Sequence, residues 1–484
     1  MTEDRSTRHR VVIIGAGPGG ICAGIRLKQA GIDDFVILEQ AAGVGGTWWH
    51  NRSPGAECDV KSHLYSYSFA LNPDWPHPFS GQRDIQGYFE ACVERFGLWP
   101  HIRLKTSVRS LEWQEETALW HADTEDGVVR GRVVISAMGM FNRLAWPEIP
   151  GRDQFAGSLF HSARWPQGLD LAGRTVGVIG SAASAVQLVP HVAQQADRLY
   201  LFQRTANWVL PKGNVPYTAE DLARFRDDPA AIQAVRTEVF DFLNALITGS
   251  NPEFPAQAEA AVREAIDQVR DPDVRQRLIP DHPFGCKRPL FSDNYYPVFN
   301  RPNVELVTER IARISDTGVV TQDGQERPAD VLIMATGFQT TRFLSAIDVV
   351  GRDGISIHDA WDDGAQAYLG ITTAGFPNLF MLYGPNTNTG SIIYAIEQQV
   401  GYILRQLERM DAEGIAWLDV RQEVMDQYNA ALQQDIDAVA VWHAPCSTYY
   451  RAPSGRIVTQ WPHTMDEFRR RTQAADPTAY EVSI

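Results

Sequence analysis

The chain is poor in cysteine, and its cysteines are not spaced as pairs. Among 484 residues there are five, and no two of them form a CxxC or CxxxxC couple: Cys22, Cys58, Cys92, Cys286 and Cys446. This spacing argues against a disulfide-stabilised scaffold, a zinc ribbon and the dithiol couple of a flavin-dependent disulfide reductase. We therefore expect a reduced, cytoplasmic protein without a metal site.

Positive charge is also scarce. Lys and Arg number 44 against 59 Asp and Glu, which gives a net charge of −15. An acidic surface repels nucleic-acid phosphates and anionic lipids, and no apolar run approaches the roughly 18 residues that a membrane span requires. With 44% hydrophobic and 21% charged residues, the composition is that of a soluble globular protein with room for several domains. We expect neither nucleic acid nor a membrane as a partner.

A glycine-rich turn near the N-terminus carries the first specific signal. Residues 11–38 are predicted to form a buried β-branched strand, a GxGxxG turn, a helix and a second strand. In this βαβ context Gly15, Gly17 and Gly20 allow a tight turn, close approach of a pyrophosphate and close packing of helix on strand. Glu39 follows the second strand and can accept hydrogen bonds from ribose hydroxyls. The unit predicts a dinucleotide site of the type that binds FAD.

A second unit of the same kind lies at residues 174–202. Where the first unit has Glu39, this one has Arg204, whose guanidinium attracts the 2′-phosphate that a carboxylate would repel, so NADPH is favoured over NADH. A solvated arginine at a strand end is the alternative interpretation. Ala182 replaces the middle glycine and places a Cβ where the pyrophosphate approaches. The turn residues of this predicted site are Gly180, Ser181, Ala182 and Ser184.

Two nucleotide sites without a cysteine couple leave oxygen as the electron acceptor that we expect. A further motif agrees with this, because residues 155–166 match the pattern FxGxxxHxxxWP. The pattern resembles the fingerprint of type I Baeyer–Villiger monooxygenases, a branch of the class B flavoprotein monooxygenases. Other segments occur in the order found in that family: Gly45–Trp49, Pro54–Asp59, Asn207–Val209, Cys286–Pro289, Ala335–Phe338 and Gly384–Asn386.

The motifs and the resemblance together predict an α/β fold. It would contain two Rossmann-like dinucleotide-binding domains, one for FAD and one for NADPH, with a mainly helical insertion. The FAD-binding domain would comprise residues 1–150 and 375–484. The NADPH-binding domain would comprise residues 151–216 and 325–374, and the insertion residues 217–324.

Roles for individual residues follow from the resemblance. Arg288 corresponds to the arginine that stands beside the flavin and, with retained NADP⁺, stabilises a C4a-peroxyflavin anion. Asp59 corresponds to the acid that holds this arginine in place. Lys287, Arg204 and Thr205 correspond to residues at the 2′-phosphate of NADPH. The remaining positions predicted to bind a cofactor are Glu39, Thr47, Trp48, Asp59, Tyr65 and Asn386.

Two aromatic positions allow more than one interpretation. Tyr449 stands where the family usually has a tryptophan that touches the nicotinamide half of NADPH or the substrate, so it is either such a contact or a packed aromatic. His161, in the FxGxxxHxxxWP motif, resembles a residue that couples the domains, and a packed, hydrogen-bonded histidine is the alternative.

The resemblance implies a FAD- and NADPH-dependent Baeyer–Villiger monooxygenase. Such an enzyme inserts one oxygen atom of O2 next to a ketone carbonyl and yields an ester or a lactone. The expected partners are therefore a ketone and O2. Two alternatives stay open: a flavin monooxygenase that oxygenates nitrogen or sulfur atoms, and an uncoupled NADPH oxidase or redox sensor.

Overall fold

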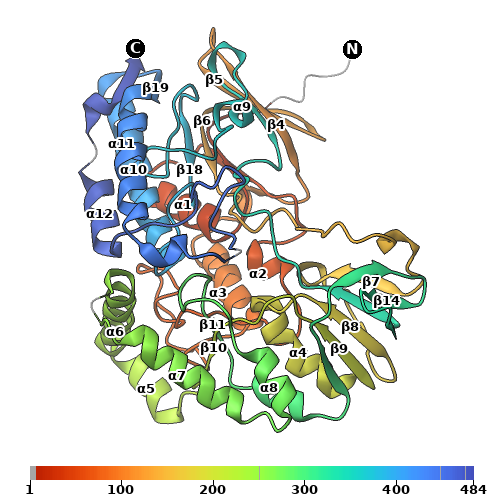
Figure 1. Ribbon diagram of the computed structural model, residues 1–484. Coiled ribbons are helices and arrows are strands. Elements are labelled where there is room, and N and C mark those ends of the chain that lie inside the picture. Colours follow the sequence, from red (N-terminus) through yellow and green to blue (C-terminus); the bar gives the residue numbers. More distant parts are fainter. Residues whose placement is uncertain (1–6, 250, 447, 475) are drawn as a thin grey trace.

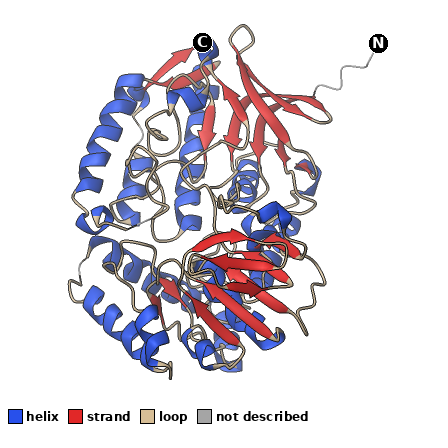
Figure 2. Cartoon of the chain, turned by 45° about the vertical axis from the view of Figure 1, so that its right-hand side comes forward, coloured by secondary structure: helices blue, strands red, loops and turns tan. Residues whose placement is uncertain are grey.

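The computed structural model describes residues 7–249, 251–446, 448–474 and 476–484. The two largest sheets lie in different halves of the molecule, and helices pack against each of them (Figures 1 and 2). The half that contains β1 and β6 carries the N-terminal nucleotide motif, and the half that contains β8 and β9 carries the second one. The fold class predicted from the sequence is confirmed.

The first sheet contains the N-terminal strand. Its strands, in spatial order, are β17 (Asp348–Val350), β4 (Val108–Gln114), β5 (Leu119–Thr124), β6 (Gly127–Ser136), β1 (Thr7–Ile14), β2 (Phe35–Leu38) and β3 (Ile102–Arg103), and β18 (Leu379–Met381) pairs with the end of β6. Strand β1 is buried on both faces: Val11 and Ile13 belong to one apolar cluster, and Val12 and Ile14 to another. The helices packed on the first of these faces are α1 (Pro18–Gln29), α3 (Gln82–Arg95) and α10 (Ile392–Glu413).

The second sheet is entirely parallel. Its strands, in spatial order, are β12 (Val304–Val307), β9 (Arg198–Phe202), β8 (Thr175–Ile179), β16 (Val331–Met334) and β7 (Ser158–His161). Helix α4 (Ala183–Gln195) packs on it. A small antiparallel sheet of β13 (Ile311–Ile314), β14 (Gly318–Thr321) and β15 (Glu326–Pro328) lies beside it (Figure 1).

The expected helical insertion is present over part of its range. Its helices are α5 (Ala219–Asp227), α6 (Pro229–Thr248), α7 (Phe254–Asp267) and α8 (Pro272–Leu278). Thr218 and Asp221 form a capping box at the start of α5, and Gly249 ends α6 in the left-handed conformation. These caps satisfy backbone groups that a helix end leaves unpaired.

Strand pairing moves two segments relative to the expected domain ranges. Strand β12, within 217–324, pairs with β9 of the second sheet, and β17, within 325–374, pairs with β4 of the first sheet. Both strands are short, and their partners are far away in sequence, so local patterning does not reveal the sheet to which each belongs. The remaining domain boundaries stay a prediction.

The C-terminal part packs against the first sheet. Strands β19 (Trp417–Val420) and β20 (Tyr480–Ser483) pair antiparallel, and the helices of this part are α9 (Ile357–Ala360), α10, α11 (Gln422–Asp437) and α12 (Met465–Gln473). Asp419 joins β19 to the loop at Gly375, whose N–H lies 3.1 Å from both carboxylate oxygens. Burial raises the pKa of Asp419 to about 7, although the Gly375 N–H and Arg352 oppose the shift.

We expect Asp419→Asn to reduce the pH dependence of stability. An unfolded aspartate ionises near pH ~4, so between about pH 4 and 7 the folded protein binds the extra proton, and stability falls as pH rises through that window. Asparagine does not ionise and keeps an oxygen for Gly375. We therefore compare the melting temperature of the variant with that of the wild type at about pH 5 and at about pH 8. The difference, variant minus wild type, should be larger at the higher pH. Exposed Asp426→Asn is the control, and an equal difference at both pH values would contradict the raised pKa.

The structure corrects the prediction that the cysteines are unpaired. Cys286 and Cys446 form a disulfide, with their Cα atoms 6.5 Å apart, whereas the sequence predicted five unpaired thiols. The two cysteines are 160 residues apart in sequence, so only the tertiary fold brings them together. Among the described residues Cys22, Cys58 and Cys92 are free and buried.

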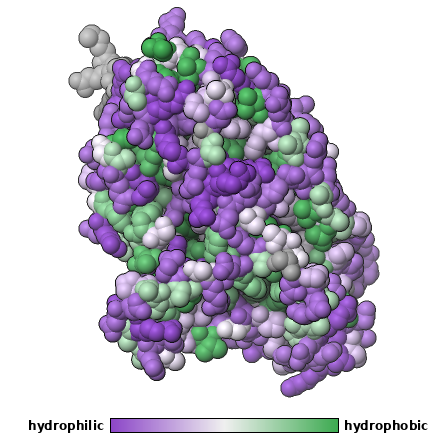
Figure 3. Space-filling view, turned by 90° about the vertical axis from the view of Figure 1, so that its left-hand side faces the viewer, coloured by the Kyte–Doolittle hydropathy of each residue, from purple (hydrophilic) through white to green (hydrophobic). Residues whose placement is uncertain are grey.

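No described helix is long and apolar enough to cross a membrane. The face of the molecule shown in Figure 3 is mostly hydrophilic, with apolar side chains in small groups.

Candidate active site

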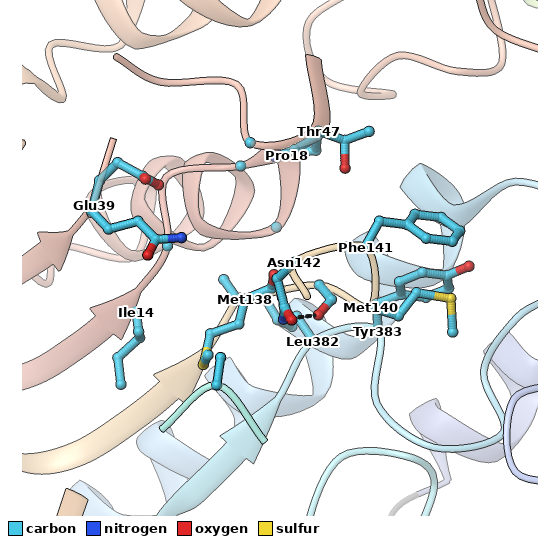
Figure 4. A pocket seen from close by; sticks show the side chains of 18 of the residues that line it. Ile14, Pro18, Glu39, Thr47, Met138, Met140, Phe141, Asn142, Leu382 and Tyr383 are labelled. Carbon is cyan, nitrogen blue, oxygen red and sulfur yellow. Dashed lines mark hydrogen bonds between the residues drawn. The ribbon is translucent and has the colours of Figure 1, made fainter. Parts of the chain in front are cut away.

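A pocket opens where the carboxyl ends of β1, β2 and β6 meet the start of α1. This is the usual ligand position in an open α/β sheet. Figure 4 shows Glu39 at one end of the pocket, Phe141 and Tyr383 at the other end, and between them Pro18, Thr47, Met138, Asn142 and Leu382.

The glycine turn of this pocket has little room for side chains. Gly15 has a φ of +101°, and a Cβ on it would lie 2.8 Å from the carbonyl oxygen of Ala137. A Cβ on Gly20 would lie 1.9 Å from the carbonyl oxygen of Gly15. Gly17 precedes α1 and provides no side-chain cap. The first N–H groups of α1 are therefore available to a phosphate, which fits a dinucleotide.

Glu39 holds the turn from the other side. It is 5% exposed, and its two oxygens accept hydrogen bonds from the backbone N–H groups of Ala16 and Ala41, each at 2.7 Å. Burial raises the pKa of Glu39, and these two N–H groups oppose the shift. Each carboxylate oxygen keeps a further lone pair, so the predicted ribose contact is compatible with this geometry.

Two of the three other residues predicted in this region line the pocket. Thr47 begins the short helix α2 (Thr47–His50), and both Thr47 and Tyr65 line the pocket. Trp48 supports Tyr65 instead, because its indole N–H donates to the Tyr65 hydroxyl at 3.1 Å and the rings meet edge to face.

The second glycine turn repeats the first. Gly180 has a φ of +111°, and a Cβ on it would lie 2.4 Å from the carbonyl oxygen of Ala335. Ala182 precedes α4 with φ −91° and ψ −162°, an extended conformation open to any residue. The Ser181 hydroxyl donates to the carbonyl oxygen of Thr205 at 3.1 Å, which ties the turn to the end of β9.

Two cations stand beside the second turn. Arg204 is exposed and Lys287 is half-buried. Burial lowers the pKa of Lys287, and the neighbouring Arg204 lowers it further, while Asp281 opposes both effects. Two like charges that approach each other are suited to an anion of more than one negative charge, such as a phosphate monoester.

Asp59 and Arg288 form an ion pair between these regions. The Arg288 Nε–H donates to Asp59 Oδ2 at 2.7 Å, and both side chains are about one-third exposed, at 38% and 31%. Burial alone would raise the pKa of Asp59, but the Arg288 guanidinium and, more weakly, Lys212 hold it below its usual value. Asp59 in turn raises the pKa of Arg288. Both groups therefore remain charged over the working pH range.

Phenols surround this ion pair. Burial raises the pKa values of Tyr383, Tyr449 and Tyr450, and the Arg288 charge opposes each of these shifts. Tyr449 and Tyr450 pack edge to face, and the Tyr449 carbonyl accepts a hydrogen bond from Thr340. Tyr449 is therefore beside Arg288, and its predicted contact with a cofactor or substrate stays a prediction.

Comparisons with known proteins agree with this arrangement. Residues 12–239 match the family model described as pyridine nucleotide-disulphide oxidoreductase. A Baeyer–Villiger monooxygenase of Streptomyces coelicolor is 40% identical over 480 residues, which cover 98% of this chain and 92% of the relative. The chain belongs to the Baeyer–Villiger monooxygenase family.

Solved structures place the monooxygenase in the same group. The crystal structure of OTEMO in complex with FAD and NADP has a TM-score of 0.89 and 29% identity, and the match covers 98% of this chain and 99% of that one. The ε-caprolactone-bound structure of cyclohexanone monooxygenase has a TM-score of 0.86 and 30% identity, with 98% and 100% covered.

The FxGxxxHxxxWP motif of the monooxygenase builds the edge strand β7 and its junction with β16. A Cβ on Gly157 would lie 2.4 Å from the carbonyl oxygen of Asp330, so the motif glycine allows the strands to approach. His161 Nδ1 accepts from the Ala163 N–H, and Nε2 donates to the Gly337 carbonyl at 3.1 Å. Burial lowers the pKa of His161. This histidine is packed and hydrogen-bonded on both nitrogens.

Asn386 also has a structural position. It is 3% exposed, and its amide nitrogen donates to the carbonyls of Ile457 and Gln460 at 3.0 Å. It thereby holds the C-terminal segment of the monooxygenase, and its predicted cofactor contact stays a prediction.

Sequence reasoning missed Tyr383 and Lys212. Tyr383 directly precedes the Gly384–Asn386 segment, which was a usable signal, whereas nothing around Lys212 distinguishes it from a surface lysine.

Proposed function

We propose that this monooxygenase uses FAD and NADPH to convert a ketone into an ester or lactone with one oxygen atom from O2. The observation that supports the proposal most strongly is the ion pair of Arg288 with Asp59, because the neighbours of this pair interact electrostatically with residues of both predicted nucleotide sites. Burial and, more weakly, the charge of Asp59 raise the pKa of Tyr65, which lines the first pocket. Lys287 follows Cys286 and precedes Arg288 in the chain, and burial and the charge of Arg204 both lower its pKa. A cation with these neighbours can act on chemistry that involves both nucleotides.

The residues present fit the two cofactors. When bound, NADPH supplies a hydride and FAD activates oxygen, and the protein supplies binding, orientation and charge. Glu39 and the free N–H groups of α1 would hold FAD, and Arg204 with Lys287 would hold the 2′-phosphate of NADPH. Arg288 provides a permanent positive charge where negative charge develops on oxygen, and Asp59 fixes its orientation.

A ketone substrate is supported by the relatives. The cyclohexanone monooxygenase structure that resembles this chain carries ε-caprolactone, the lactone product class expected here. Cyclic ketones are therefore the first substrates to test, followed by linear and aryl ketones.

Paired substrates test the proposal. The purified yellow protein is incubated with NADPH, oxygen and either a cyclic ketone or a dialkyl sulfide, and products, NADPH consumption and hydrogen peroxide are measured. We expect lactone in near-stoichiometric ratio to NADPH. Sulfoxide without lactone would identify a heteroatom oxygenase, and hydrogen peroxide without either product would identify an oxidase.

Arg204→Ala tests the assignment of the second site. A charge-assisted hydrogen bond to phosphate contributes about 1.5–3 kcal/mol, so KM for NADPH should rise by about 10- to 100-fold while KM for NADH, which lacks the 2′-phosphate, changes little. Steady-state kinetics with both nucleotides measures this. The control is Arg174→Ala, an exposed arginine that precedes β8 at the opposite end of the sheet. An equal loss with both nucleotides would rule out the phosphate contact.

A further inference from the structure

Lys212 is a buried cation with no role in the function proposed above. Its side chain is 1% exposed, and its ammonium lies 2.7 Å from Glu57 Oε1. The ammonium also donates to the carbonyl oxygen of Cys58 at 2.8 Å and stands 4.9 Å from the centre of the Phe79 ring. A buried ammonium is costly unless it is paired and hydrogen-bonded in this way. The fold therefore provides specific partners, Glu57 and the carbonyl oxygen of Cys58, for the buried ammonium of Lys212.

Lys212 and Arg288 extend from one small ribbon. Strands β10 (Val209–Leu210) and β11 (Leu290–Phe291) pair in parallel. Lys212 follows β10 and Arg288 precedes β11. Both cations reach the same segment, 57–59, where Lys212 contacts residues 57 and 58 and Arg288 contacts residue 59. The residues that flank the two strands therefore hold this segment through two neighbouring contacts, one from Lys212 and one from Arg288.

The turn that carries Lys212 is itself fixed. Asp293 accepts hydrogen bonds from the backbone N–H groups of Lys212 at 2.7 Å, Gly213 at 3.0 Å and Asn214 at 3.3 Å. The Asn214 side chain exchanges hydrogen bonds with both backbone groups of Phe79, at 2.8 and 3.0 Å. Lys212 therefore lies in a turn whose backbone is hydrogen-bonded to Asp293 and whose next residues are tied to Phe79.

The charges around Asp59 give Lys212 an electrostatic effect as well. The groups that interact electrostatically with Asp59 are the cations Arg288 and Lys212, the thiol of Cys58, and the phenols of Tyr65, Tyr383 and Tyr449. The thiol and the phenols are neutral at working pH, because burial raises their pKa values. Lys212 is therefore a second cation that favours the ionised form of Asp59.

We propose that Lys212 is a positioning residue that holds the 57–59 segment against the ribbon, so that Asp59 keeps Arg288 oriented for oxygen transfer. This inference rests on the proposed function. Without Lys212, the Cys58 carbonyl loses its donor and Glu57 loses its cation. Asp59 then shifts, and Arg288 loses the orientation that its 2.7 Å bond provides. A small misplacement of a catalytic group is enough to slow a reaction strongly.

The test compares Lys212→Met with Lys212→Arg. We expect Lys212→Met to lower the amount of lactone formed per NADPH consumed, which is the coupling ratio, by about tenfold. The NADPH consumed without lactone formation should yield hydrogen peroxide. Lys212→Arg, which keeps the positive charge, should retain most of the wild-type coupling ratio. The acid limb of lactone formation should move to higher pH in Lys212→Met, because loss of a nearby cation raises the pKa of Asp59. Lys61→Met is the control, since Lys61 pairs with Glu238 on the surface.

A double-mutant cycle separates positioning from a general structural effect. In the Asp59→Asn background, Lys212→Met should cause little further loss of coupling, because it acts through Asp59. Additive losses would overturn the proposal, as would wild-type coupling in Lys212→Met. If Lys212→Met is insoluble, Lys212→Gln keeps a donor for Cys58 without the charge and should show the same shift of the acid limb.

A crystal structure of Lys212→Met gives a readout that is independent of activity. The Arg288 Nε to Asp59 Oδ2 separation should exceed hydrogen-bonding distance, and an unchanged bond would contradict the inference. If the wild type itself forms no lactone, the proposed function fails, whereas this structural comparison still decides whether Lys212 holds the ion pair.

Discussion

Replacing Arg288 with alanine is expected to reduce lactone formation by about 10²–10³-fold while the protein stays yellow. The guanidinium donates a hydrogen bond to Asp59 and has phenols as neighbours, and it is not part of the glycine turn that we propose as the FAD site. Its loss therefore removes charge stabilisation without dismantling the flavin site. Lactone yield, NADPH oxidation and the flavin absorption spectrum of the purified variant measure the two effects separately.

Two further variants calibrate this result. Arg301→Ala removes an exposed arginine whose side chain reaches only the neighbouring Asn303 among its described contacts, so it should retain full activity. Arg288→Lys keeps the charge but loses the Nε–H that Asp59 accepts, so it should recover a small part of the rate. Lactone formation by Arg288→Ala at the wild-type rate would disprove the role of Arg288.

Gly20→Ala is expected to yield a protein largely without flavin. The added Cβ would lie 1.9 Å from the carbonyl oxygen of Gly15, so α1 must move away from the turn. Overpacking of this kind costs about 1–3 kcal/mol. Where this cost falls on the FAD-bound form of the turn, it weakens flavin binding by about 5- to 150-fold. The ratio of flavin to protein absorbance after gel filtration, and titration of the apoprotein with FAD, measure the loss.

The matched control is Gly87→Ala within α3. A Cβ there has no neighbour within 4 Å, so flavin content should be unchanged, and the melting temperature should stay equal or rise. Full flavin occupancy in Gly20→Ala would show that α1 can adjust, and that close packing at this turn is not required for the cofactor.

Local motifs predicted much of the fold and several of the residues that line the first pocket. The GxGxxG turn and Glu39 were identified because their spacing follows from the geometry of a βαβ unit, which is confined to about 30 residues. The second unit followed from the same geometry, and the change from Glu39 to Arg204 was visible at the equivalent position. The ion pair of Asp59 and Arg288 came from the family resemblance, and the structure brings these two residues together.

Features that depend on distant segments were not predicted. The disulfide joins cysteines 160 residues apart, and strand β17 joins a sheet whose other strands are mostly N-terminal. Lys212 is informative only because the fold buries it against residues 57 and 58. In each case the neighbouring sequence carries no motif that indicates the structural role, which is set by a contact with a distant part of the chain.

Oxygen-isotope labelling tests the central claim most directly. The enzyme is incubated with NADPH and a cyclic ketone under oxygen-18 gas, and the product is analysed by mass spectrometry. A Baeyer–Villiger monooxygenase will yield a lactone that carries one heavy oxygen atom, located in the ring, with the carbonyl oxygen unlabelled. Unlabelled ketone recovered together with consumed NADPH and hydrogen peroxide, or a product labelled from water, would contradict the account.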